Sequence, residues 1–275
     1  MTYKTNKGYG GWVGLLLGIV VFGFIIWGIN FSLDESDRTL KTLLNVPTYL
    51  FLAGYVYLVL GAFTLGYKME EDGLVIVWGL QRKKITWDQF DEIIEIKGQP
   101  NLIPFLAVAW WGYIFGLYTV RGLGPVRMYA TYTDDGFLYL KTKAGFFGIS
   151  PADGSMLTAL IAKTSRTVTS LDMDQMSEEE KGESIRDDSA FNMYYKLNLL
   201  FLGIFAGYLG IFFPGSDAPR FVVLLLVLAV VLFLFNVSNA KRLFQFSTLG
   251  AYFTLIIGMA VTGIFIILSL AEIGF

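Results

Sequence analysis

The stretch GLVIVWGLQRKKITWDQF, residues 73–90, opens the long polar segment of a chain whose other long stretches are apolar. Its run of β-branched and aromatic residues, LVIVW, follows Asp72-Gly73, a pair typical of hairpin turns. A basic turn, Arg82-Lys83-Lys84, then separates this run from a second strand. The same order recurs where Asp135-Gly136 precedes FLYL. We therefore expect a small water-soluble antiparallel β domain over residues 67–167.

The rest of the chain has the composition of a membrane protein. With 55% hydrophobic residues, 16% charged residues and a mean hydropathy of +0.57, its 275 residues are too apolar for a soluble domain. Uncharged stretches long enough to cross a hydrocarbon core as helices cover residues 12–33, 45–66, 197–213, 221–237 and 246–270. The predicted fold class is an α-helical multi-pass membrane protein with five spans and an inserted cytoplasmic β domain.

Four parts follow from this pattern. Two spans occupy residues 1–66, the β domain occupies residues 67–167, an acidic linker covers residues 168–190, and three spans occupy residues 191–275. The linker is expected to be solvated, because it is rich in acidic residues and poor in large apolar ones.

The orientation of the spans follows from lysine and arginine in their short flanks. The basic groups lie at Lys4 and Lys7, at residues 82–84, and at Lys241-Arg242. Five spans place all of them on one face, which the positive-inside rule assigns to the cytoplasm. The prediction is a multi-pass protein of the cell membrane with its N-terminus and β domain inside and its C-terminus outside.

Residues 102–120, LIPFLAVAWWGYIFGLYTV, are apolar and long enough to form a sixth span. Both flanks of this stretch are basic, however, so a crossing would carry one positive cluster to the outside. Pro104 and several glycine residues also give the stretch the character of turns and strands. We expect a hairpin of the β domain that rests against the bilayer or dips into it, with a true crossing as the alternative.

The β domain also resembles a known family. The likeness rests on DGLVI with WGL at residues 72–80, KITWD leading into FDEI at residues 84–93, the glycine-rich run ending VRGLGPVRMYAT at residues 120–131, and GISPAD at residues 148–153. Together they resemble the bacterial pleckstrin-homology-like (PH-like) domains of membrane proteins over residues 67–167. The resemblance implies a bent seven-stranded antiparallel barrel capped by one C-terminal helix. It also implies a binding or assembly module without catalytic residues.

Two groups of side chains are candidate contact sites. The exposed apolar character expected of residues 104–125 makes this stretch a candidate surface for a partner or the membrane. The residues singled out there are Phe105, Trp110, Trp111, Tyr113, Phe115, Tyr118, Arg121 and Arg127. Arg82, Lys83 and Lys84 are candidates for contact with anionic lipid, although a solvated turn that obeys the positive-inside rule explains them as well.

Catalysis has little support in the composition. The chain has no histidine and no cysteine, so the commonest general base and the thiolate metal ligands are missing. The acidic pairs near Asp72 and Asp135 could bind a cation, but their Asp-Gly context favours a role in turns. Ser150, followed by Pro151, is expected to cap a closing helix rather than act as a nucleophile. We predict no catalytic residues, no metal site and no cofactor.

Two classes of function remain open. The first is a non-enzymatic membrane protein whose PH-like domain binds or scaffolds a partner protein, in envelope stress, bacteriocin immunity or assembly of a membrane complex. The second is a lipid-binding or channel-like protein regulated by that domain. Expected partners are membrane lipid and a membrane or cytoplasmic protein; a net charge of −2 gives no support for nucleic acid. Small-residue spacing at Gly10, Gly14 and Gly18, and at Gly203 and Gly207, suits either a homo-oligomer or packing within one chain.

Overall fold

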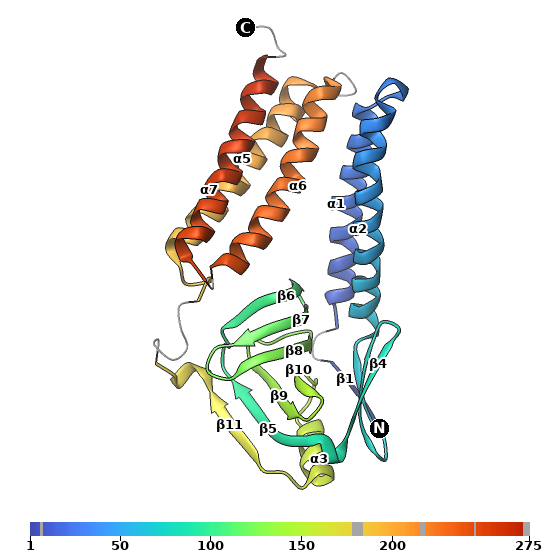
Figure 1. Ribbon diagram of the computed structural model, residues 1–275, viewed down its shortest axis with the longest axis vertical. Coiled ribbons are helices and arrows are strands. Elements are labelled where there is room, and N and C mark those ends of the chain that lie inside the picture. The colour runs from blue at the N-terminus through green and yellow to red at the C-terminus, as the bar shows by residue number, and fades with distance from the viewer. Residues whose placement is uncertain (6–7, 178–183, 215–217, 245, 272–275) are drawn as a thin grey trace. The chain divides into compact units, whose positions relative to one another are not determined.

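The computed structural model describes residues 1–5, 8–177, 184–214, 218–244 and 246–271, and it divides into two compact units (Figure 1). The first unit comprises Met1–Gly18 and Ala53–Glu183, and the second comprises Ile19–Leu52 and Ser184–Phe275. The first unit holds the β domain together with one end of each of the first two helices. The second unit holds the remainder of those helices and the three that follow.

The first unit contains two sheets. The four-stranded antiparallel sheet has the order β1 (Thr2–Lys4), β2 (Gly66–Met69), β3 (Gly73–Trp78) and β4 (Gln81–Thr86). The seven-stranded sheet has the order β11 (Val168–Asp172), β5 (Phe90–Lys97), β9 (Gly136–Thr142), β10 (Gly145–Ile149), β8 (Gly124–Ala130), β7 (Tyr113–Val120) and β6 (Leu102–Trp110). The β11/β5 and β10/β8 pairs are parallel, and the others are antiparallel.

This β structure agrees with the expected domain but differs in detail. A large sheet region is present where a PH-like domain was predicted, but it is not wholly antiparallel as expected, because two of its strand pairs are parallel. Closure into a barrel stays a prediction. Three-residue strand β1, which precedes the first helix, was not foreseen. Strand β11 occupies the start of the predicted acidic linker, so residues 168–172 are part of the sheet rather than solvated linker. Residues 178–183 of that linker lie outside the described residues.

The opening hairpin corrects the predicted position of the basic residues. Trp78 pairs with Gln81, so the turn consists of Gly79 and Leu80, and Gly79 adopts a φ of 56° that suits glycine. Arg82, Lys83 and Lys84 therefore lie within strand β4 and not in a turn. Successive side chains of a strand point to opposite faces, which separates Lys83 from its two neighbours.

Residues 102–120 form the β6–β7 hairpin of the larger sheet, with Trp110 paired to Tyr113. The hairpin prediction is confirmed, and the helical crossing is not what the chain forms. Gly112 has a φ of 83° in the turn, a conformation that side chains rarely tolerate.

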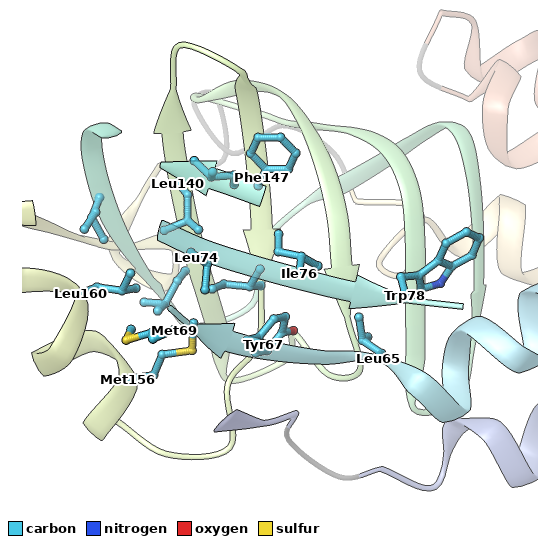
Figure 2. Close-up of a cluster of buried hydrophobic side chains, with 14 of the residues drawn as sticks. Leu65, Tyr67, Met69, Leu74, Ile76, Trp78, Leu140, Phe147, Met156 and Leu160 are labelled. Atoms are coloured by element: carbon cyan, nitrogen blue, oxygen red, sulfur yellow. The ribbon is translucent and has the colours of Figure 1, made fainter. Parts of the chain in front are cut away.

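The core of the β domain lies beneath strands β2 and β3 and helix α3 (Ser155–Thr164) (Figure 2). Met156 and Leu160, four residues apart on α3, face the same side and are fully buried. The predicted closing helix is confirmed, but its cap is not Ser150. Gly154 occupies the N-cap position, and buried Ser150 instead accepts a hydrogen bond on Oγ from the Thr131 backbone N–H at 2.9 Å.

Five helices in the described residues are long and apolar enough to cross a membrane (Figure 1). They are α1 (Gly10–Ser32), α2 (Arg38–Thr64), α5 (Ser189–Phe212), α6 (Arg220–Leu243) and α7 (Thr248–Ala271), with the short helix η1 (Glu35–Asp37) between α1 and α2. Helix α5 begins well before the span predicted at residue 197, because Asp188 caps it by accepting a hydrogen bond from the Phe191 N–H. Residues 215–217, between α5 and α6, and residues 272–275, after α7, lie outside the described residues.

The helices of the second unit contact one another through small, apolar and polar residues. Gly28 of α1 lies against Val227 of α6, and Phe205 of α5 is fully buried against α6. Asn198 of α5 donates to the backbone oxygen of Leu255 of α7 at 2.9 Å. Arg220 and Asp34 form a salt bridge at 2.8 Å that joins the α1–α2 connection to the start of α6.

Candidate functional site

The predicted aromatic surface is built largely into a junction between the β6–β7 hairpin and helices α1 and α2. The Trp110 Nε1–H donates to the backbone oxygen of Gly10 at 2.7 Å, and the Tyr55 O–H donates to the backbone oxygen of Gly14 at 2.6 Å. The rings of Tyr55 and Trp110 lie 5.7 Å apart. Helix α1 thus accepts two hydrogen bonds from aromatic side chains, one from the β6–β7 hairpin and one from α2.

Glycine residues make this close packing possible. A Cβ at Gly10 would overlap the backbone oxygen of Gly112, and a Cβ at Gly14 would lie 2.7 Å from the Trp110 ring. Likewise, a Cβ at Gly61 of α2 would overlap the indole of Trp78. Because any larger residue would push the backbones apart, these glycines fix how closely the helix ends approach the sheet.

Trp78 is the centre of the buried aromatic group behind the hairpin. Its Nε1–H donates to the Tyr113 hydroxyl at 2.6 Å, and its ring stacks on Phe115 with centroids 3.8 Å apart. Tyr57 of α2 meets the same indole edge-on at 5.1 Å. Burial raises the pKa of Tyr113, so this phenol stays neutral and serves as a hydrogen-bond partner rather than an acid.

The eight residues predicted as one surface do not form one. Tyr113 and Tyr118 are buried, and Trp110 and Phe115 are half-buried within the junction. Phe105, Trp111, Arg121 and Arg127 are exposed. The division follows from position. Tyr113 and Tyr118 point into two different core clusters of the domain, Trp111 lies in the hairpin turn, Phe105 lies at a register shift of β6, and Arg121 and Arg127 lie outside the hairpin. A contact role stays a prediction for the exposed residues.

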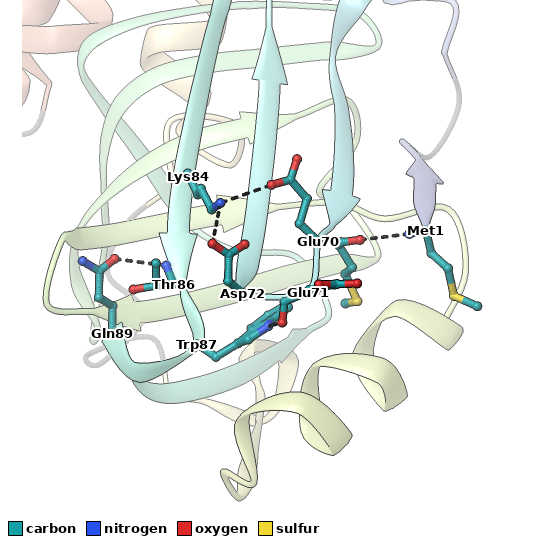
Figure 3. A network of polar contacts seen from close by, with 9 residues as sticks. Met1, Glu70, Glu71, Asp72, Lys84, Thr86, Trp87 and Gln89 are labelled. Carbon is teal, nitrogen blue, oxygen red and sulfur yellow. Dashed lines mark hydrogen bonds and ion pairs between the residues drawn. The ribbon is translucent and has the colours of Figure 1, made fainter.

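The three basic residues of β4 do not form one cluster either. Lys84 forms salt bridges with Asp72 at 2.7 Å and with Glu70 at 3.3 Å (Figure 3). The hydrogen bond from Lys84 lowers the pKa of Asp72, and the same bond raises the pKa of Lys84. Lys83 lies on the other face, with Nζ 6.0 Å from the centre of the Phe147 ring. Arg82 is exposed and forms no salt bridge with residues that the structure describes.

The acidic residues before β3 have the turn role that was expected. The Glu70 N–H donates to the Gly73 backbone oxygen at 2.9 Å, which closes the β2–β3 turn. The Trp87 Nε1–H donates to the Glu71 backbone oxygen at 2.9 Å (Figure 3). Within the described residues, no group of three or more His, Cys, Asp or Glu side chains is placed to hold a metal ion.

Two features of this unit had no recognisable signal in the sequence. Strand β1 pairs with β2 in the register Tyr3 to Tyr67, which attaches the segment before α1 to the strand after α2. Ser150 is linked to the same strand, because its N–H donates to the Tyr67 hydroxyl at 3.0 Å and that hydroxyl donates to the Tyr129 backbone oxygen at 2.6 Å. Burial raises the pKa of Tyr67, which keeps this hydroxyl neutral and able to donate.

Residues 65–164 match a family model described as Bacterial PH domain. The resemblance to PH-like domains is thereby confirmed for this segment, and the match does not extend to helices α5 to α7. Neither a curated protein nor a solved structure matches the chain. The fold and the match together define a bacterial PH-like domain joined to five apolar helices. Domains of this kind are binding modules for protein or lipid and are typically not catalytic.

Proposed function

We propose that this chain is a non-enzymatic, five-span protein of the cell membrane whose cytoplasmic PH-like domain binds a partner protein. The observation that carries the proposal is strand β4, an exposed polar edge of the four-stranded sheet. Among the described residues, no strand pairs with the side of β4 that faces away from β3. Proteins commonly recognise an extended segment of a partner by adding it to such an edge.

The membrane part of the proposal is supported by the surfaces of the helices. Large apolar side chains are highly exposed on several of them, including Leu50 and Phe51 of α2, Ile211 of α5 and Phe235 of α6. In water such surfaces would be costly, whereas lipid tails accommodate them. The pairing of β1 with β2 also supports a shared side for the N-terminal segment and the domain, since α1 and α2 lie between them in the sequence. The lysine and arginine pattern favours the cytoplasm for that side and the outside for the C-terminus.

A phosphate-binding role for the domain has weaker support. A site for anionic headgroups needs several basic groups that converge, but Lys84 is neutralised by two carboxylates and Lys83 faces the Phe147 ring. Arg82 alone cannot supply such a pocket. We therefore favour protein over anionic lipid as the ligand of β4.

The hairpin geometry identifies the backbone groups that a partner strand would use. In a two-residue hairpin the closing pair, Trp78 and Gln81, is hydrogen-bonded, and bonded and non-bonded pairs then alternate along the strands. Arg82 and Lys84 fall in the non-bonded pairs. Their backbone N–H and C=O groups consequently point away from β3 and are available for a further strand.

Pull-down of the detergent-solubilised full chain tests this function with two variants at one position. Arg82→Pro removes an outward N–H while leaving the β3–β4 ladder intact, since proline is tolerated at a strand edge. Arg82→Ala removes the charge and keeps the N–H. We expect a stoichiometric protein to copurify with the parent chain and with Arg82→Ala, and to be lost with Arg82→Pro at an unchanged thermal unfolding midpoint.

The opposite pattern would reject the proposal. Equal recovery with both variants would exclude the β4 edge as the binding site. Copurified lipid in place of a protein, lost with Arg82→Ala, would favour the lipid-binding alternative, and ion flux in liposomes would favour the channel-like one.

A further inference from the structure

The β6–β7 hairpin carries exposed apolar side chains that the junction with α1 and α2 does not use. Trp111 is 75% exposed, Leu106 is 65% exposed and Phe105 is 53% exposed. A register shift between Pro104 and Leu106 leaves Phe105 without a partner on β7. Such a bulge turns side chains away from strict alternation, which explains why two successive apolar residues face outward.

Contacts within the first unit fix the level of this hairpin along helix α1. The Trp111 ring meets the Tyr9 ring edge-on with centroids 6.1 Å apart, and Tyr9 directly precedes Gly10, the first residue of α1. The backbone of Gly112 lies against Gly10, and Trp110 donates to the Gly10 backbone oxygen. Trp111 therefore lies beside the first turn of α1.

The length of α1 places that turn at a membrane boundary. At 1.5 Å per residue, its 23 residues span about 34 Å, close to the ~30 Å of a hydrocarbon core. Trp12 in the first turn is 63% exposed and packs edge-on against Phe63 near the end of α2, with centroids 5.2 Å apart. Tryptophan and tyrosine concentrate at this depth in membrane proteins because their rings are apolar and their N–H or O–H groups are polar.

We infer that the exposed side of the β6–β7 hairpin is embedded in the lipid interface, with Trp111 of its turn and Leu106 and Phe105 of β6 contacting the boundary between headgroups and acyl chains. This inference rests on the membrane crossing of α1 in the proposed function. Lipid is the occupant that the geometry favours, because the patch continues the exposed aromatic surface of α1 and α2 and because β6 contains no charged residue. The hairpin and the first two helices together hold the PH-like domain against the bilayer.

Site-directed nitroxide labelling of the full chain in vesicles of phosphatidylcholine and phosphatidylglycerol tests the inference. The sequence has no cysteine, so single substitutions give single labels. Trp111→Cys and Leu106→Cys probe the hairpin, and the second variant retains Trp111. Val20→Cys, on an exposed position of α1, reports membrane insertion, and Ala162→Cys, on the exposed side of α3, reports the aqueous phase. Collisions with oxygen measure contact with lipid, and collisions with a water-soluble nickel chelate measure contact with water.

We expect the labels at positions 111 and 106 to lose most of the nickel accessibility seen at position 162 and to gain oxygen accessibility, with depths between those of positions 162 and 20. Nickel accessibility equal to that at position 162, with position 20 still in lipid, would overturn the inference and leave the membrane protein intact. Labels shielded from both reagents would show that protein covers the hairpin, which also overturns it. Nickel access at position 20 would instead reject the crossing of α1 itself.

Discussion

In the first unit, Gly10, Gly14 and Gly18 of α1 are each covered by a neighbouring group, whereas in the second unit Gly203 and Gly207 of α5 face open space. Both sets have the same spacing of four residues, which places glycines on one face of a helix. The partners of α1 are the Gly112 backbone and the rings of Trp110 and Tyr55. Identical spacing thus serves a tight internal contact in one unit and leaves a surface free in the other.

The two units also differ in whether their buried polar groups have hydrogen-bond partners. In the first unit, aromatic donors such as Trp110 are paired with helix carbonyls. In the second unit, Asn198 is paired with the Leu255 carbonyl, but the Nδ2 group of Asn236 is buried without a partner in the described residues. The contacts of the first unit are therefore the more completely satisfied, and we expect substitutions there to have larger effects.

The largest effect is expected for Gly10→Val. Its side chain would overlap the backbone oxygen of Gly112, and backbone cannot move aside as a flexible side chain can. The loss of unfolding free energy should reach or exceed the about 1–3 kcal/mol typical of an overpacked core. Tryptophan fluorescence during thermal unfolding of the detergent-solubilised chain measures it.

Gly8→Val is the matched control for this substitution, because a Cβ at Gly8 would meet nothing within 4 Å. We expect its unfolding midpoint to stay at that of the parent chain. Equal midpoints for Gly10→Val and the parent would show that the helix ends are not locked to the hairpin.

A smaller effect is expected for Gly258→Ala in the second unit. The added methyl group would overlap Nδ2 of Asn236, but this is the far end of a side chain that can rotate. A loss of about 1 kcal/mol is reasonable for such a partly relieved overlap. Gly203→Ala on α5 meets open space and should be neutral or slightly stabilising, since alanine favours helix.

The Gly203→Ala variant also tests self-association. If Gly203 and Gly207 form the contact of a homo-oligomer, Gly203→Ala should weaken cross-linking in the membrane without lowering the stability of the chain. A marked loss of stability for Gly203→Ala in a monomeric preparation would break the contrast between the two units.

The parts of this architecture that were predictable are those with local patterns. The apolar helices follow from the length of their uncharged stretches, and strand β3 follows from the Asp-Gly pair and the β-branched run after it. The β3–β4 hairpin and helix α3 were also expected, but their turn and cap lie at Gly79-Leu80 and Gly154 rather than at the basic residues and Ser150. Strand β1 was not predictable, because three residues carry no pattern and its partner lies more than sixty residues away. The same holds for the inward position of Trp110. The sequence shows where aromatic residues stand along the hairpin. It does not show that α1 packs against the hairpin and covers the face that carries Trp110.

The smallest effect is expected from removal of the exposed ion pairs of Lys84. This change tests how much surface contacts, rather than buried ones, contribute to the stability of the first unit. The hydrogen bond from Lys84 lowers the pKa of Asp72 below its ordinary value of about 3.9. The stabilisation is therefore fully present above that value and is lost as the pH falls through the lowered pKa. Lys84→Gln should reduce this acid-induced loss of stability, and Lys83→Gln, on the opposite face of β4, should leave it unchanged. Thermal unfolding measured from about pH 6 to pH 3 distinguishes them. Added salt should shrink the difference, because exposed charges are screened, and a difference that persists at high salt would assign it to a buried contact instead.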